Sequence, residues 1–533
     1  MIRYKYCKDH EPSLRKQHSQ NKLSGAVRER IWKLSCVWVK RSQNELSSGK
    51  QKKITALFSE GRPMSGRNRE SEKNAASGEV LRSEKDITSE VVIKYEKASR
   101  LENMTLLMKE NLLRNLIISF AVLLTAAAFL CDSPADILLG MEKILTARSV
   151  LITDYFVVGG MGAAFLNAAL VLAVGIVLVL ANKIPFSGPT MAALFMNAGY
   201  GLWGKNPMNI IPIVLGIQIY CRIHHIKLSR HIYTTLYGTC LAPFVTEIYF
   251  LLHLPVAVRF LAAILLGILI GYLLPPLSMH TASMHMGYNL FNVGFSAGIL
   301  AFVAVCIMNS MGITSESVLV WQTGQPPEIV AGLYLLFITV FLIGFMSGGC
   351  KWSGLRKIFS RPGRAATDFV LMDGASPTMM NMGLVGIICT TYILLIGGDF
   401  SGPVVGAIIM AFGFSAFGAH VKNYLPVLLG IYLFTFISQY QPVTPGIQLA
   451  AIFGVGLSPI AGQFGILAGI LAGMLHSAIS MCTARFYGGL NLYNNGFSAG
   501  WVAIFMIPAL ENIIGHYKDY KEKKSEHPQK NTK

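Results

Sequence analysis

From about residue 111 to residue 514, apolar runs follow one another with only short polar segments between them. Most runs have roughly 17 to 25 residues, the length that an α-helix needs to cross about 30 Å of hydrocarbon. Hydrophobic residues make up 53% of the chain and charged residues 14%, whereas a soluble domain carries roughly 25% charged residues. The sequence therefore predicts an all-α polytopic membrane protein with about 14 transmembrane segments.

We place these segments at residues 111–131, 155–181, 187–204, 207–221, 232–252, 259–277, 295–313, 329–349, 376–397, 400–418, 423–438, 446–462, 464–481 and 497–514.

One passage of the chain occurs twice. GYNLFNVGFSAG at 287–298 and GLNLYNNGFSAG at 489–500 are identical at nine of twelve positions. An ungapped match at an offset of 214 residues also pairs Asp154 with Asp368 and the FSGP block that begins at Phe186 with the one that begins at Phe400. The difference in residue number between matched positions is 216 where Pro243 matches Pro459, and it is 202 over the duplicated passage. The chain is therefore predicted to contain two repeats of six apolar segments, with the run 329–349 between them.

Loop charges predict how the repeats are oriented. The loop 222–230 is basic, but its counterpart around 438–445 has no Lys or Arg. The segment after the first repeat, 314–328, also lacks basic residues, whereas the loop 351–364 and the C-terminal tail are basic. Placing every basic segment in the cytoplasm puts both termini inside and turns the second repeat upside down in the membrane. Two inverted-topology repeats are therefore expected.

Two kinds of segment within each repeat are candidates for interrupted, re-entrant helices. Gly, Pro and Asn gather at the FSGP blocks and at the duplicated passage, and these residues break a helix and pair its freed backbone groups. Turns at the membrane surface are the alternative interpretation. We favour a solute site at which both interrupted segments of both repeats meet. Its candidate residues are Ser187, Asn289, Asn292, Ser401, Asn491 and Asn494.

Three further polar residues lie inside apolar runs. Asn167 and Asn381 are paired by the repeat, and an Asn in a membrane core must find a partner on a helix or on a substrate. Glu247 is an intramembrane acid whose counterpart is Gln463, which suits either a functional site or an acid that reaches the membrane surface. No metal site and no cofactor are expected, because the zincin, nucleotide-loop and nucleophile-elbow motifs are missing.

The predicted domain order begins with a basic, polar segment at 1–103. This segment is interpreted as a cytoplasmic tail, as disorder, or as sequence upstream of a true start at Met104 or Met108. The first span and an external segment follow at 104–152, and membrane repeat one occupies 153–313. A linking span with a basic cytoplasmic loop occupies 314–366, membrane repeat two occupies 367–514, and a basic cytoplasmic tail occupies 515–533.

The run that begins at Asp132 and reads DSPADIL, the LITDY block at 151–155, the FSGP block and the NLYNNGFSAG block resemble a bacterial membrane family. That family is known as domain-of-unknown-function family 1576, and the resemblance covers about residues 110–515. It implies the membrane class without implying a substrate. A second, architectural similarity is to urea transporters, whose inverted halves also carry two helix breaks.

These observations favour a permease or channel for a small polar solute in the cell membrane. Its expected partners are the solute, a coupling ion if transport is coupled, and the lipid bilayer; nucleic acid is not expected. One alternative is an intramembrane enzyme that acts on a lipid, with Glu247, His280 or Arg485 in its site. Another is a membrane scaffold or receptor. We favour transport over catalysis because the polar candidates occur as pairs in two inverted repeats.

Overall fold

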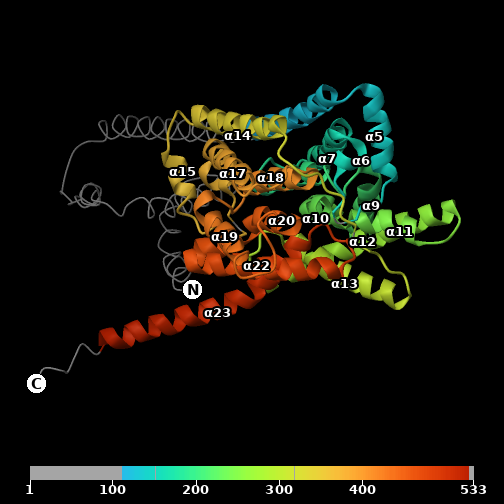
Figure 1. The fold of residues 1–533 in the computed structure, drawn as a ribbon. Helices are drawn as coiled ribbons and strands as arrows, with labels where there is room; N and C mark the ends of the chain where they lie inside the picture. Colours follow the sequence, from blue (N-terminus) through green and yellow to red (C-terminus); the bar gives the residue numbers. More distant parts are fainter. Residues whose placement is uncertain (1–110, 151, 317, 366, 527–533) are drawn as a thin grey trace, which may run out of the picture. The chain divides into compact units, whose positions relative to one another are not determined.

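The computed structural model describes residues 111–150, 152–316, 318–365 and 367–526, with side chains as far as residue 513. The predictions for 1–103 and for Met104 and Met108 lie outside these residues. Within the described ranges, every element is helical and there is no strand. The predicted all-α class is therefore confirmed, and Figure 1 shows the order of the helices.

The first part of the chain forms a long helix, Asn111–Cys131, and then a series of helices that ends at residue 310. These are α5 (Pro134–Thr146), α6 (Tyr155–Gly159), α7 (Met161–Ala181), α8 (Gly188–Tyr200), α9 (Pro207–Ile223), η2 (Leu228–His231), α10 (Ile232–Gly238), η3 (Thr239–Leu241), α11 (Ala242–Leu251), α12 (Val256–Met284) and α13 (Asn292–Ser310).

The second part also begins with a long helix, and its helices follow in nearly the same order. They are α14 (Pro327–Ser347), α15 (Ser353–Ile358), α16 (Phe369–Asp373), α17 (Ala375–Leu395), α18 (Gly402–Phe414), α19 (Val421–Phe434), α20 (Pro445–Phe453), η4 (Gly454–Leu457), α21 (Ser458–Phe464), α22 (Ile466–Phe486) and α23 (Asn494–Glu526).

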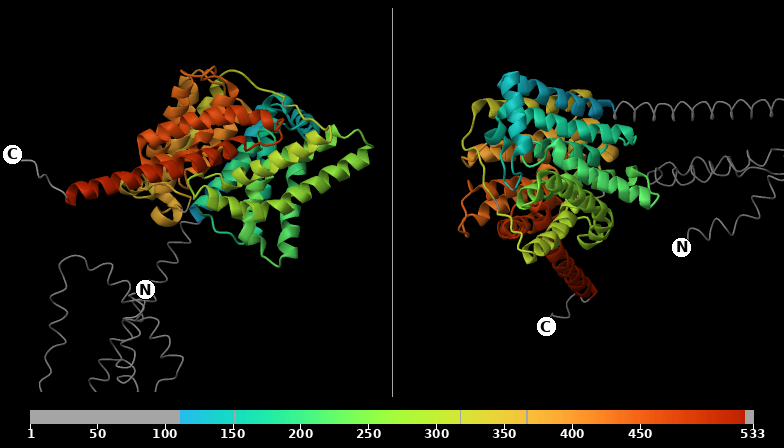
Figure 2. Two further views of the ribbon diagram at one scale, coloured as in Figure 1. Left: turned by 90° about the horizontal axis from the view of Figure 1, so that it is seen from below. Right: turned by 90° about the vertical axis from the view of Figure 1, so that its right-hand side faces the viewer.

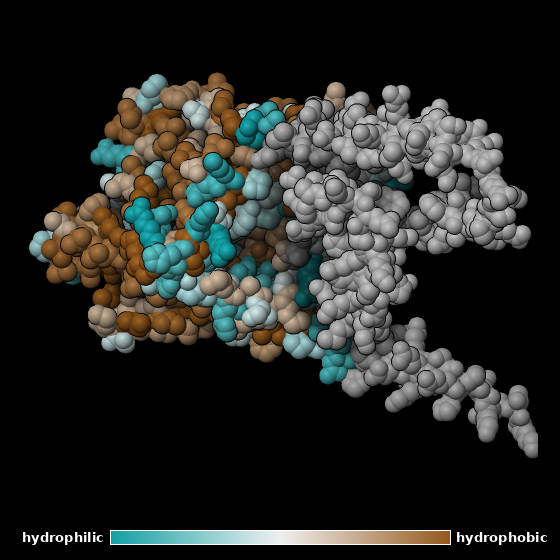
Figure 3. Space-filling view, turned by 180° about the vertical axis from the view of Figure 1, so that it is seen from behind, coloured by the Kyte–Doolittle hydropathy of each residue, from teal (hydrophilic) through white to brown (hydrophobic). Residues whose placement is uncertain are grey.

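Nine helical segments in the described ranges are long and apolar enough to cross a membrane. The pair α8 and α18 is different, because each has 13 residues and is therefore too short to span the hydrocarbon. Brown, hydrophobic residues dominate the part of the surface that is visible in Figure 3. The membrane class is thus supported, while the count of fourteen segments stays a prediction.

Each FSGP block starts a helix shortly after the preceding helix has ended, at Ala181 or at Leu395. Ser187 and Ser401 are the N-caps of α8 and α18, and a proline stands in the first turn of each helix. Proline lacks the backbone N–H that a continuing helix would need, but it fits the first helical turn, where that N–H would have no partner. Each FSGP block is therefore a helix start, while a re-entrant helix at this place stays a prediction.

The short helices α8 and α18 pack directly against each other in the core, and nearly every residue of both is buried. A Cβ atom at Gly199 would lie 2.2 Å from the Gly406 carbonyl oxygen, and one at Gly413 would lie 2.6 Å from the Cβ of Phe195. The end of α8 thus lies beside the beginning of α18, so the two helices are antiparallel. Glycine is required at these positions because the backbones approach so closely.

The duplicated passages also meet. Gly294 and Gly496 hold the same place in the two passages, and a Cβ built on either would lie within 3.2 Å of the other's Cα. The rings of Phe295 and Phe497 stack next to them, with centroids 5.9 Å apart. From this contact α13 and α23 run in opposite directions (Figures 1 and 2).

Candidate functional site

A buried carboxylate lies at the N-terminus of each short core helix, and it comes from the other half of the chain. Asp154 caps α6 by accepting a hydrogen bond from the Phe156 N–H. The same side chain accepts from the Gly402 N–H of α18 at 3.1 Å and from the Gln322 N–H at 3.0 Å. Asp154 is completely buried, and three backbone donors offset its desolvation.

Asp368 makes the equivalent contacts with the halves exchanged. It caps α16 by accepting from Val370 and Leu371, and it accepts from the Gly188 N–H of α8 at 3.1 Å. The helix N-termini that could have received an anionic solute are therefore occupied by carboxylates of the protein itself.

The interrupted passages also bond to the opposite half in matched ways. The Leu290 N–H donates to the carbonyl of Gly456 at the end of η4, and the Leu492 N–H donates to the carbonyl of Cys240 in η3. The Asn289 side chain accepts from its own segment at Phe291 and donates across to the Gly496 carbonyl at 3.1 Å. The two passages therefore form one buried junction.

Asn491 is the counterpart of Asn289 and is equally buried. Its side-chain oxygen accepts from the Tyr493 N–H, but its amide nitrogen has no hydrogen-bond partner. This position therefore offers a free donor in the junction.

The other two predicted asparagines brace neighbouring helices. Asn292 donates to the Ser278 carbonyl, and Asn494 donates to the Ser480 carbonyl. The oxygen of Asn494 accepts from the Thr483 hydroxyl, and Thr281 gives the same contact to Asn292. Both amides thus hold the end of one long helix to the start of the next.

The predicted serines have local partners. The Ser187 hydroxyl lies 3.4 Å from Thr190 and 3.5 Å from Tyr233, and the Ser401 hydroxyl accepts from the Val404 N–H. In the described ranges neither serine is hydrogen-bonded to any of the four asparagines, whereas Asn289 bonds to the Gly496 carbonyl of the opposite passage.

Asn167 and Asn381 close the turns that follow α8 and α18. Asn167 donates to the carbonyls of Gly201 and Lys205, at 2.6 and 2.8 Å. Asn381 donates to those of Ser415 and Ala419, at 2.8 and 2.9 Å. The side-chain oxygens of both are buried without a hydrogen-bond partner. The prediction that an Asn in the core must find a partner is met by these turns.

A completely buried lysine stands in the turn after α8. The Lys205 ammonium donates to the side-chain oxygens of Asn197 and Thr239, at 3.1 and 2.8 Å, and to the Tyr493 hydroxyl at 3.4 Å. It also lies 5.2 Å from the ring centroid of Tyr200 and 5.3 Å from that of Tyr493. Three neutral acceptors and two aromatic faces therefore hold the charge, and no carboxylate bonds to it in the described part of the chain.

This arrangement occurs in one half only. At the matching positions of the other half, every polar or ionisable side chain of the Lys205 cluster is replaced by an apolar one. The replacements are Ala411, Phe414, Ala419, Val455 and Phe291, in the places of Asn197, Tyr200, Lys205, Thr239 and Tyr493. A charge in a membrane protein core is costly and is usually retained for function, so this difference between otherwise similar halves marks a functional candidate.

A comparison with protein families finds a match that covers most of the described helices. Residues 133–310 and 349–512 match the family described as protein of unknown function, DUF1576. The chain belongs to the DUF1576 family. No curated protein and no solved structure matches it. The matched ranges include both Asp caps, the junction and the Lys205 cluster.

Glu247 of this DUF1576 protein is paired. Its carboxylate is completely buried and receives two-pronged hydrogen bonds from the Arg148 guanidinium, the shortest 2.6 Å long. The hydrogen bond to Glu247 raises the pKa of the Arg148 guanidinium. Glu247 therefore ties α11 to the segment between α5 and α6.

The residues of the enzyme alternative are not assembled. Glu247 is occupied by Arg148, while His280 and Arg485 are both exposed. His285, the other histidine of that region, is buried and bonded to Asn292 at 2.9 Å.

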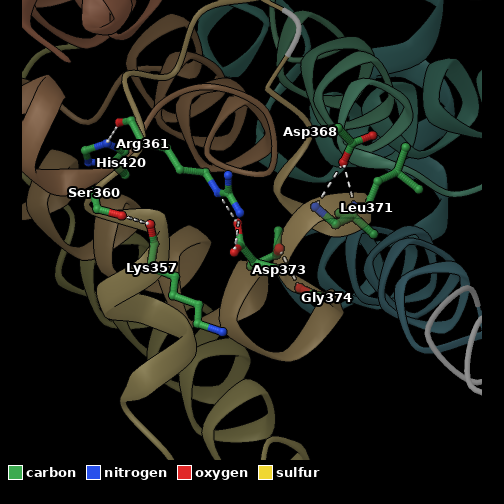
Figure 4. A network of polar contacts seen from close by, with 10 residues as sticks. Lys357, Ser360, Arg361, Asp368, Leu371, Asp373, Gly374 and His420 are labelled. Atoms are coloured by element: carbon green, nitrogen blue, oxygen red, sulfur yellow. Dashed lines mark hydrogen bonds and ion pairs between the residues drawn. The ribbon is translucent and has the colours of Figure 1, made fainter. Parts of the chain in front are cut away.

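A second polar network ties the basic loop before α16 to the core (Figure 4). Arg361 makes a two-pronged ion pair with Asp373, at 2.6 and 2.8 Å. The Arg361 carbonyl lies 2.9 Å from the ring nitrogen of His420, the N-cap of α19. This network anchors the loop close to Asp368 and its short helix α16.

Sequence reasoning missed Lys205, Arg148 and the caps Asp154 and Asp368 as site residues. Lys205 falls between two predicted segments and so resembles an ordinary loop lysine. The sequence did contain one indication that Lys205 is special, because the matched position of the otherwise similar second repeat is Ala419.

Proposed function

We propose that this DUF1576 protein is an integral membrane permease or channel for a small polar solute, built from two inverted repeats around a buried junction. The observation that carries the proposal is the reciprocal exchange of caps. Asp154 caps α18 of the other half, and Asp368 caps α8 in the same manner. Such an exchange is expected of two halves related by a twofold axis.

The direction of the axis supports inversion. The matched helices α8 and α18 are antiparallel, as the contacts of Gly199 with Gly406 and of Gly413 with Phe195 require. A twofold axis along the helices would leave them parallel, so the axis crosses them. For helices that run across a bilayer, such an axis lies in the membrane plane, which is the arrangement of many transporters.

The order of helices suggests larger repeats than the sequence predicted. The helix Asn111–Cys131 precedes α5, α6 and α7 as α14 precedes α15, α16 and α17. In this proposal α14 is the counterpart of the first helix rather than an extra span between the repeats.

The chemistry of the junction favours solute handling over a purely structural role. Polar groups in hydrocarbon cost several kcal/mol each unless they are paired, so a scaffold gains little from placing asparagines and a lysine there. The junction contains the Asn491 amide, which has no hydrogen-bond acceptor among the described residues, and the Lys205 ammonium of the first half. The proposed partners are a small polar solute, a coupling ion if transport is coupled, and the lipid bilayer of the cell membrane.

Purified protein in liposomes tests this proposal. We would follow vesicle swelling by light scattering under gradients of glycerol, acetamide, glycine and acetate, which sample neutral, zwitterionic and anionic solutes. Protein-dependent entry of at least one class is expected, and it should fall in Lys205→Met liposomes. Equal entry into protein-containing and empty liposomes for all four probes would contradict a permease of this type.

A further inference from the structure

Unpaired polar atoms are concentrated in the second half, around the segment 491–495. Both ring nitrogens of His476, the side-chain oxygen of Asn495 and the amide nitrogen of Asn491 are buried, and within the described ranges none of them makes a hydrogen bond of ordinary geometry. The hydroxyls of Tyr487 and Ser458 are in the same state. Since buried polar groups in proteins are nearly always paired, such a group of unpaired atoms needs an explanation.

His476 and Asn495 form the centre of this group. His476 lies in α22, is completely buried, and its ring faces the Asn495 side chain at the start of α23. No hydrogen bond of ordinary geometry joins them. The Tyr487 hydroxyl likewise faces the Asn491 side chain without such a bond.

The neighbouring Lys205 cluster provides a contrast. All three donors of the Lys205 ammonium are used by protein acceptors, so that cluster is closed to a ligand in this conformation. The histidine ring has one donor and one acceptor to offer when it is neutral, and both are free. The available hydrogen-bonding capacity therefore lies at His476.

The first half lacks these groups. On the repeat offsets, His476 matches Leu274, Asn495 matches Val293 and Ser458 matches Ala242. The same backbone arrangement is therefore stable with apolar side chains at all three places. This comparison argues against a purely structural need for the polar residues, because the first half packs without them.

We propose that His476 and Asn495 form a binding site for a neutral ligand that both donates and accepts hydrogen bonds, such as water or a small amide or alcohol. The ring supplies a donor and an acceptor, and the Asn495 oxygen supplies a second acceptor. The side chain that the ring faces is the neutral Asn495, so neither an anion nor a cation would find a countercharge there. The assignment of this ligand as the transported solute rests on the proposed permease function, whereas the existence of the site does not.

The test uses variants copied from the first half. The triple variant His476→Leu, Asn495→Val, Ser458→Ala removes the site while installing side chains that the matching positions already accommodate. His476→Gln keeps a hydrogen-bond donor and an acceptor, and it replaces the triple variant in the test if that variant does not fold. Ser477→Ala is the matched control, because the Ser477 hydroxyl is bonded within its own helix to Gly473.

The first measurement is a high-resolution structure of the full-length protein, with and without acetamide. We expect non-protein density within hydrogen-bonding distance of the His476 ring and Asn495, which is lost in the triple variant and kept in Ser477→Ala. Finding both ring nitrogens bonded to protein atoms, with no such density, would overturn the site. Density that is unchanged by acetamide would identify the ligand as water and overturn the solute assignment.

The second measurement is acetamide and glycerol entry into proteoliposomes. The triple variant should be about tenfold slower than wild type, which corresponds to a loss of about 1.4 kcal/mol of interaction with the solute. His476→Gln should retain more of the rate than His476→Leu. If wild type transports the solute and the triple variant transports it equally fast, the ligand of this site is not the transported solute, and the permease proposal stands. Ligand density without any transport would reject the permease and leave the site standing.

Discussion

The environment of Lys205 is polar, whereas the matched position, Ala419, has apolar residues at the corresponding places. Its ammonium bonds to groups of the first half and to Tyr493 of the second, so one cation joins two parts of the junction. Because its acceptors are neutral, the cost of burying the charge is only partly recovered. We therefore interpret Lys205 as a residue that positions the interrupted segment, at some expense in stability.

This interpretation predicts opposite effects of Lys205→Met on stability and transport. Removing an uncompensated buried charge should leave the thermal unfolding midpoint unchanged or higher, because Thr239 and Asn197 still bond to each other and to the Leu236 carbonyl. Solute entry into liposomes should fall by about tenfold. Thr239→Val installs the residue found at the matched position, Val455, and serves as a milder change because Lys205 keeps its charge and loses one of its three acceptors. Wild-type transport by Lys205→Met would refute a functional role for the charge.

The pair of Arg148 and Glu247 predicts an asymmetric result. Glu247 is completely buried, whereas the Arg148 side chain is 41% exposed. Arg148→Ala strands a buried carboxylate and should cost about 3 kcal/mol of unfolding free energy. Glu247→Gln keeps a hydrogen-bonding group and leaves an arginine that can reach solvent, so it should cost less. Thermal unfolding of the two purified variants checks the order, and the reverse order would contradict it.

At the scale of elements, the short helices α8 and α18 depend on carboxylates from the opposite half. Replacing Asp154 or Asp368 by Ala leaves the amide of Gly402 or Gly188 buried without its partner. Each change should cost about 1–3 kcal/mol, and the Asn variants should cost less because an acceptor remains.

The comparison is made by thermal unfolding, with Asp136→Ala as a control, since Asp136 is an exposed residue in the first turn of α5. If the Asp154 and Asp368 variants melt like this control, the exchanged caps do not stabilise the junction.

At the scale of the whole molecule, the proposed inverted arrangement predicts which loops face each side of the membrane. With both termini in the cytoplasm, the segment 314–326 is external and the basic loop 351–364 is internal. We expect an impermeant thiol reagent outside cells to label Thr323→Cys and to spare Ser360→Cys, both at exposed positions.

The background must lack the native cysteines, because Cys131, Cys306, Cys350 and Cys482 are exposed among the described residues. Labelling after the membrane is permeabilised should reach Ser360→Cys and shows that this thiol is reactive. External labelling of Ser360→Cys before permeabilisation would reverse the proposed orientation.

The sequence by itself determined the membrane class, the places where helices stop and the similarity between the halves. These properties are local, because a run of apolar residues must be helical in hydrocarbon and a proline after Ser187 or Ser401 starts a helix wherever it packs. The asparagines of the junction were found for the same reason, since each stands two residues from a glycine in a passage that occurs twice.

Only the tertiary structure decided which groups are paired. Asp154 meets Gly402 and Lys205 meets Tyr493 across more than 240 residues of chain, and no local pattern encodes such contacts. The predicted candidate Glu247 received a partner in Arg148, while His476 received none. Whether a buried polar side chain has a hydrogen-bond partner depends on how the two halves pack. In a membrane core, the side chains with partners stabilise the fold, and those without partners can bind a ligand.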